Sequence, residues 1–228
     1  MPTLVTSYFA ESSKSGDTST LNTPSFTPAN GEVIVVKAAT WDSGTPSGTP
    51  SGGSQTFTQQ ATAAPGGFNG YVTIFTAVVS GSPGSMAVTL SAPAGSCYHT
   101  MVVERWTSAT LAATPAVSSP INGSGTPSAT ITTTAANSIV TWGSMDENSN
   151  DPASRAYLSG ATEDGLGDAH TQTSSVHYYA YQTAASAGSQ TIGLSAPGSQ
   201  AWTMIGIEIK NQAAAPSSPA GAFMPFFS

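Results

Sequence analysis

The chain has 228 residues, enough for one large all-β domain or two small domains. Only 7% of its residues are charged, and 5 basic against 12 acidic side chains give a formal net charge of −7. So few basic residues cannot form an electropositive track, which excludes a nucleic-acid partner from our expectations. No apolar run is long enough to span a membrane, so we expect no membrane partner either.

The first residues, Met1–Val5, lack the basic segment and the long apolar core of a secretory signal, and we expect none. The single cysteine, Cys97, excludes an internal disulfide and lies among apolar residues. We therefore predict that Cys97 is a small core residue rather than a reactive thiol.

Short apolar runs with period-2 alternation predict β-strands along most of the chain. Turn-forming residues such as Gly81–Gly84 and Pro93–Gly95 separate these runs, and no stretch has helical periodicity. The predicted main strands are 32–41, 71–79, 85–91, 98–106, 137–145, 175–184, 189–195 and 201–210, with edge strands near 3–9, 24–28 and 128–134. Residues 43–70 and 146–174 are predicted to be long loops, a type of segment that is often functional in a compact domain.

The sequence also contains an internal repeat at a spacing of 104 residues. Residues 72–104 align without gaps to residues 176–208, with nine identities in 33 positions that include Leu90/Leu194 and Glu104/Glu208. Each half therefore predicts a strand, a long loop and a three-strand meander.

These observations predict an all-β fold, an antiparallel jelly-roll-like β-sandwich built from two pseudo-repeats. The sandwich is expected to span residues 1–212, with pseudo-repeats at about 25–108 and 129–212. Because one meander alone cannot bury both of its faces, a single domain of two interlocked repeats is favoured over two independent domains.

No catalytic motif is present, so we expect a protein that is not an enzyme and needs no cofactor. The acidic segment 146–151 is the only cluster of oxygen ligands to consider, and calcium is the cation that such oxygens bind. Its spacing does not match an EF-hand, so we expect an ordinary polar loop and no metal site. Among the histidines, His99 is predicted to be a core or interface residue.

The aromatic residues are predicted to serve mainly for packing. Trp41, Trp106, Trp142 and Trp202 fall on or beside predicted strands, where a sugar-stacking platform is the alternative to a core position. Tyr178, Tyr179 and Tyr181 alternate along one strand, so at least one of them should point away from the core. We predict that these three tyrosines form a candidate binding or subunit surface.

Glu104 and Glu208 occupy equivalent positions in otherwise apolar strands. A charge in such a place is costly unless it is paired, so we predict structural roles, with Arg105 or Lys210 as partners.

The C-terminal segment 213–228 differs from the rest of the chain. Residues 213–221 have the composition of a linker, and an apolar tip follows. Because exposed apolar patches promote aggregation, we expect this tip either to fold back on its own domain or to dock on a partner. The predicted docking residues are Phe223, Met224, Pro225, Phe226 and Phe227.

Three segments resemble accessory virion proteins of tailed phages that infect actinobacteria: Gly31–Ala38, Val102–Trp106 and Asp151–Tyr157. The resemblance covers roughly residues 25–212 and carries no catalytic residues. It implies a minor tail or capsid-decorating protein, made in the host cytoplasm without a signal peptide and located in the virion. The implied partners are other capsid or tail proteins and further copies of the chain. The alternative is a carbohydrate-binding module that recognises a host surface glycan.

Overall fold

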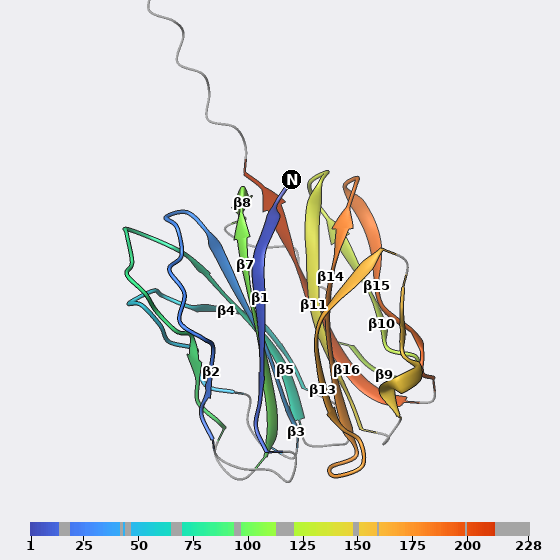
Figure 1. Ribbon diagram of the computed structural model, residues 1–228. Coiled ribbons are helices and arrows are strands. Elements are labelled where there is room, and N and C mark those ends of the chain that lie inside the picture. Colours follow the sequence, from blue (N-terminus) through green and yellow to red (C-terminus); the bar gives the residue numbers. More distant parts are fainter. Residues whose placement is uncertain are drawn as a thin grey trace, which may run out of the picture.

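The computed structural model is an all-β protein whose strands pair in antiparallel sheets (Figure 1). Its one helical segment among the described residues is a short 3-10 turn, η1 (Pro152–Ser154), and no described helix is long and apolar enough to cross a membrane. The structure describes residues 1–13, 19–41, 43, 47–64, 70–93, 97–112, 121–147, 151–158, 160–198 and 200–212, without the side chains of 121–123 and 200.

The first half of the chain forms a large sheet and a small one. The large sheet has the strand order β1-β7-β3-β5-β4, and β2 pairs with β6 in the small sheet. Isolated bridges extend this small sheet at Phe26–Met86 and Ser51–Thr89. The bounds of these strands are β1 Thr3–Glu11, β2 Leu21–Asn22, β3 Val33–Trp41, β4 Thr58–Ala63, β5 Gly70–Val78, β6 Thr89–Leu90 and β7 Tyr98–Thr107.

The second half also forms a large and a smaller sheet. The large sheet has the order β13-β14-β11-β16, with β8 and β9 both pairing along the outer edge of β16. The smaller sheet has the order β10-β15-β12. The bounds of these strands are β8 Ala109–Thr110, β9 Ile121–Gly125, β10 Ser128–Thr133, β11 Ser138–Asp146, β12 Ala156–Tyr157, β13 Ala161–Ala169, β14 Ser175–Ala184, β15 Gly188–Ala196 and β16 Gln200–Asn211.

The two large sheets pack face to face in the middle of the molecule, and a smaller sheet covers each of them on the outside (Figure 1). Three apolar clusters fill the spaces between these layers. The central cluster contains Val35 and Val102 from the first half with Ile207 from the second. One outer cluster, around Phe75, lies within the first half, and the other, around Trp142, lies within the second. Strands of the two large sheets therefore bury side chains on both faces, one in the central cluster and the other in an outer cluster.

The predicted main strands are confirmed within a few residues, apart from 85–91, which forms only a bridge and the two-residue β6. The predicted edge strand at 24–28 is likewise reduced to one bridge, at Phe26. The prediction of continuous loops at 43–70 and 146–174 is wrong, because β4 lies in the first segment and β12 and β13 lie in the second. These strands carry few apolar side chains, and their backbones pair with β5, β14 and β15 at the sheet edges.

Candidate functional site

The predicted tyrosine surface on β14 is wrong for two of its three residues. Tyr178 and Tyr179 are both 0% exposed, and only Tyr181 is half-buried. The alternation directs Tyr178 into the second-half core and Tyr179 into the central core, since both faces of β14 are covered by another sheet. Tyr181 packs edge-on against Trp106, with 5.2 Å between the ring centroids.

The tryptophans are placed mainly in the cores, as predicted. Trp106, Trp142 and Trp202 are buried, and the half-buried Trp41 packs against the central cluster. Three of the four indole rings therefore have no face available for stacking on a sugar. The predicted docking residues Phe223–Phe227 lie outside the described residues.

A cluster of three charged side chains lies buried between the two large sheets. Lys37 Nζ is 2.9 Å from Glu104 Oε1, and 2.9 and 2.8 Å from the two carboxylate oxygens of Asp164. The side chains of Lys37 and Glu104 are fully buried, and that of Asp164 is 2% exposed. We call these three residues the inter-sheet triad.

Two further side chains fix the position of Glu104. Thr141 Oγ1 donates to Glu104 Oε1 at 2.8 Å, and Trp106 Nε1 donates to Oε2 at 3.0 Å. The Lys37 ammonium also lies 5.8 Å from the centre of the Tyr179 ring, which favours the cation. The triad is thus held by side chains from both halves of the chain.

The local structure of each strand explains why these three side chains meet. Lys37 follows Val33 and Val35 on the inner face of β3, and Glu104 follows Val102 on the inner face of β7. Asp164 lies at a β-bulge, since the register of β13 against β14 shifts between Glu163 and Gly165. A bulge redirects a side chain, and here it places a carboxyl group of an edge strand in the core.

Burial and charge act in opposite directions on the groups of the triad. Burial raises the pKa of Asp164 well above its usual range, although the Lys37 ammonium opposes this change. Burial also acts to raise the pKa of Glu104, but Lys37 and the surrounding donors outweigh it, so the pKa of Glu104 is lowered. For Lys37 the desolvation is outweighed by the two carboxyl groups, and its pKa is raised. Of the two carboxyl groups beside the lysine, Asp164 therefore holds a proton more readily than Glu104.

The partners predicted for Glu104 and Glu208 are not those in the structure. Arg105 points to the opposite face of β7, where it forms a 2.9 Å ion pair with Glu32. Glu208 accepts hydrogen bonds from the backbone amides of Thr134 and Ala135, each at 3.0 Å. Both glutamates are buried and bonded, which agrees with the structural roles predicted for them.

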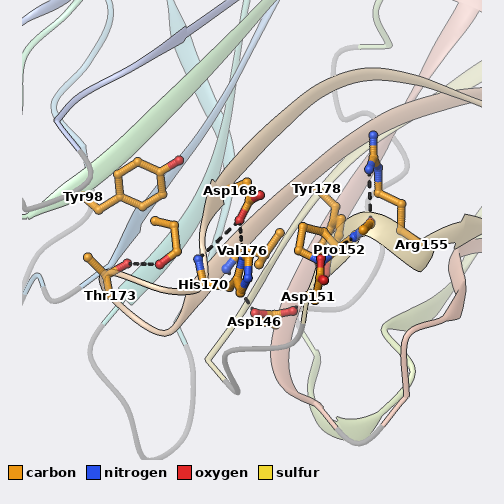
Figure 2. Close-up of polar contacts among 12 residues, drawn as sticks. Tyr98, Asp146, Asp151, Pro152, Arg155, Asp168, His170, Thr173, Val176 and Tyr178 are labelled. Carbon is orange, nitrogen blue, oxygen red and sulfur yellow. Dashed lines mark hydrogen bonds and ion pairs between the residues drawn. The ribbon is translucent and has the colours of Figure 1, made fainter.

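A second polar group lies at one end of the second-half large sheet (Figure 2). Asp146 accepts hydrogen bonds from Val176 N at 3.0 Å and from the Tyr178 hydroxyl at 3.1 Å. Nearby, His170 Nδ1 lies 2.5 Å from Asp168 Oδ1. In the same region Asp151 accepts from Ala153 N and caps η1.

This second group does not form a metal centre with the residues that the structure describes, where no set of three His, Cys, Asp or Glu side chains converges. Asp146 belongs to β11 and is fully buried, whereas Asp151 is exposed. Residues 148–150 of the acidic segment lie outside the described part of the chain.

The histidines and Cys97 lie mainly in the interior. Cys97 and His99 are buried, as predicted. His177 is fully buried too, and its Nδ1 is 2.7 Å from Thr100 Oγ1 on the facing sheet. Burial lowers the pKa of His177 to about 3, so its ring is neutral and contributes a polar contact between the sheets.

Replacing Asp146 by asparagine is expected to change how stability depends on pH. Burial raises the pKa of Asp146 to about 7, despite opposing hydrogen bonds from Tyr178 and Val176. The folded state therefore holds this proton more tightly than the unfolded chain, and wild-type stability falls as pH rises from about 4 to 7, by up to about 4 kcal/mol. Asparagine cannot ionise, so the variant should gain stability over wild type across that window, as measured by urea unfolding at pH 4, 6 and 8.

The matched control is Asp151→Asn, which changes an exposed carboxylate and keeps a side chain able to cap η1. Its stability relative to wild type should not vary with pH in the same way. A constant difference between Asp146→Asn and wild type at all three pH values would contradict the prediction.

Sequence reasoning missed two members of the inter-sheet triad, Lys37 and Asp164. A signal for Lys37 exists, because it is the one charge within the apolar segment Val33–Ala39. Chemically, the triad places an amine, a carboxyl group and a proton acceptor in contact, away from water.

No family model, curated protein or solved structure matches this chain in the comparisons. The inter-sheet triad and the order of the strands are therefore the features on which a functional inference can be based.

Proposed function

We propose that this protein is a structural accessory component of a bacteriophage particle, a minor tail or capsid-decorating protein that acts by binding other virion proteins. The observation that carries the proposal is the strand order within each half of the chain. That order supports a pair of jelly rolls, an architecture common among viral capsid proteins and also found in lectins. The resemblance of three sequence segments to virion accessory proteins points the same way.

The jelly-roll interpretation follows from how the second half is threaded. A jelly roll has two sheets, and its eight strands in chain order pass between them so that the first strand pairs with the last. Here β9 pairs with β16, β16 with β11 and β11 with β14, while β10, β15 and β12 form the facing sheet. The edge strand β13 differs by pairing with β14 in the large sheet.

We infer further that the two halves are structural pseudo-repeats. The first half has the order β1-β7-β3-β5-β4, which corresponds strand for strand to β9-β16-β11-β14-β13. The last strand in each of these orders carries a register shift at a corresponding place. The shift lies between Gln59 and Ala61 in β4 and between Glu163 and Gly165 in β13. Gln60 and Asp164, the residues at these two bulges, are 104 positions apart, which is the spacing of the sequence repeat.

The repeats share the central core, which supports one domain over residues 1–212. The strand correspondence extends each repeat beyond the bounds predicted from sequence, since β1 and β2 precede residue 25 and β9 precedes residue 129. A rigid body of four layers with buried ion pairs suits a particle component that must persist outside the cell without disulfides.

Deleting residues 213–228 is expected to leave a folded domain that no longer enters particles. In this proposal the apolar tip anchors the protein to the virion or to a sister subunit, while the β-sandwich forms the exposed body. The measurement compares the amount of full-length and truncated protein in gradient-purified particles of the encoding phage, by quantitative mass spectrometry.

The matched variant keeps the linker and replaces only the apolar side chains of the tip, Phe223, Met224, Phe226 and Phe227, by serine. It should be lost from particles to the same degree as the deletion, while circular dichroism shows an intact fold. Particles that carry the truncated chain at the full-length level would exclude the anchor.

The carbohydrate-binding alternative has weaker support. Lectin domains share the jelly-roll architecture, but Trp106, Trp142 and Trp202 are buried and cannot provide a stacking platform. Binding on a glycan array by the isolated protein, abolished by a change at an exposed aromatic residue such as Phe9, would favour this alternative over a purely structural role.

A further inference from the structure

We propose that Lys37 and Asp164 become covalently joined inside the folded protein by an amide bond between Lys37 Nζ and Asp164 Cγ, with Glu104 moving the protons. The inter-sheet triad would then be a self-modification site. The proposal rests on the geometry of this triad and is independent of any role in a virion.

The first requirement for such a reaction is contact between the two reacting groups. The Lys37 amine lies 2.9 and 2.8 Å from the two carboxyl oxygens of Asp164, so the carbon between those oxygens is the nearest electrophile. Fixed groups in contact react as though at very high concentration, because their translational and rotational freedom is already lost. The two strands that carry these groups, β3 and β13, belong to different sheets and hold them there.

The second requirement is an environment that favours condensation over hydrolysis. Lys37 and Glu104 are fully buried and Asp164 is nearly so. The Tyr179 ring and the Trp106 indole line the site and add bulk around it. Exclusion of water removes a reactant of the reverse reaction and strengthens electrostatic interactions within the site.

The third requirement is a suitable proton on each group. A neutral carboxylic acid is a better electrophile than a carboxylate, and burial favours the neutral form of Asp164 by raising its pKa. The amine must lose a proton before it can attack, and Glu104 Oε1 contacts Lys37 Nζ at 2.9 Å to accept it. A hydrogen bond also joins Glu104 to Asp164, so one carboxylate reaches both reacting groups.

The reaction balances without any external reagent. Glu104 takes a proton from the Lys37 ammonium, and the free amine attacks Asp164 Cγ to form the new N–C bond. Glu104 then passes that proton to the departing hydroxyl of Asp164, the C–O bond breaks, and water leaves. The remaining excess proton on nitrogen returns to Glu104, which ends as a neutral acid. No atom is oxidised or reduced.

The second-half equivalent of this site offers an internal comparison. The repeat places Glu208 opposite Glu104, Thr141 opposite Lys37 and Gln60 opposite Asp164. Glu208 bonds to the backbone of Thr134 and Ala135 instead of an amine. The reactive set is therefore present in one copy, and its bond would link the two halves across 127 positions of the chain.

The test is the mass of the purified full-length protein under denaturing conditions. We expect it to be lighter than the sequence by the mass of one water molecule. Tryptic digestion of the denatured chain should not cleave after Lys37, because its amine is acylated, and should give peptide 15–105 joined to peptide 156–210. Fragmentation of that joined peptide should locate the link at Lys37 and Asp164.

The key variant is Glu104→Gln, which keeps the shape of the side chain but cannot accept a proton. We expect it to show the full unreacted mass, whereas the matched control Glu208→Gln retains the bond. An unreacted wild-type mass, together with tryptic cleavage after Lys37, would reduce the triad to an ion pair and overturn the proposal. Undiminished linkage in Glu104→Gln would overturn the assigned role of Glu104. If Glu104→Gln does not fold, the wild-type mass and peptide map alone decide.

Discussion

Replacing Lys37 by methionine is expected to destabilise the protein by about 3–5 kcal/mol at pH 8, the usual effect of removing one partner from a buried ion pair. Methionine fills a similar volume, so the loss comes from charge rather than from a cavity. Glu104 would be left as a buried carboxylate with no cation, beside the carboxyl group of Asp164. This effect applies to the triad as an ion pair; in an amide-linked protein, loss of the bond takes the place of loss of the cation. Urea unfolding monitored by tryptophan fluorescence measures the change.

The same variant should recover stability as the pH falls. Without the lysine, burial and mutual repulsion raise the pKa of both carboxyl groups above their values in the unfolded chain. The folded state then binds more protons than the unfolded state, so stability is greatest at low pH and is lost as the pH rises. In the wild-type cluster only Asp164 has a raised pKa, because Lys37 lowers that of Glu104, so the wild type should show a weaker dependence on pH.

The control for this experiment is Lys210→Met, which removes a half-buried lysine near the end of β16. Its stability should differ from wild type by less than about 1 kcal/mol, as is usual for substitutions outside the core and outside buried charge networks. Equal losses in the two variants, or a loss in Lys37→Met that is the same at pH 5 and pH 8, would show that Lys37 is not balancing buried carboxyl groups.

The parts of the fold that were predicted from sequence are those in which apolar alternation carries the information. β3, β11, β14 and β16 are dense in apolar side chains, and their bounds were found within two residues. β4 and β13 could not be found in this way. Their sequences, TQQATA and ATEDGLGDA, have few apolar positions, and these edge strands are held by backbone pairing that leaves no composition signal.

The site was only partly accessible to sequence reasoning. Glu104 was recognised as a buried charge, but its neighbour Arg105 was a poor choice of partner. Adjacent residues on a strand point to opposite faces, so Arg105 lies in the first-half outer layer beside Glu32 and Phe26. The true partner of Glu104 is Lys37. The second carboxyl group of the triad, Asp164, reaches the core through a bulge on an edge strand of the other large sheet, and no local pattern indicates that arrangement.

The same reasoning explains the error over the β14 tyrosines. An alternating strand has one outward face only if one side of its sheet is open to solvent. In a four-layer structure the two large sheets are covered on both sides, so the tyrosines of both faces are buried. The chain has only 5 basic residues, and two of them, Lys37 and Arg105, pair with glutamates in the interior.

Replacing Gly193 by alanine is expected to be among the most damaging single changes, with a loss of about 2–6 kcal/mol from backbone strain combined with overpacking. Gly193 has a φ of +125°, a conformation that side chains disfavour. A Cβ there would lie 2.2 Å from the backbone oxygen of Pro127, which cannot yield as a side chain would. Gly193 is the last residue of β15 that pairs with β10, and the next residue, Leu194, pairs with β12 on the other edge, so the close approach lies where the three strands of the outer sheet meet.

Gly188, at the other end of β15, separates the two contributions. Its φ of +130° imposes similar strain, but an added Cβ would meet no atom within 4 Å. Gly188→Ala should therefore lose only the conformational part, about 1–3 kcal/mol. The two variants are compared by thermal unfolding with near-ultraviolet circular dichroism, to which the second-half tryptophans contribute. Equal losses would mean that β15 can move away from Pro127 at no cost, and that the outer sheet is not fixed at Gly193.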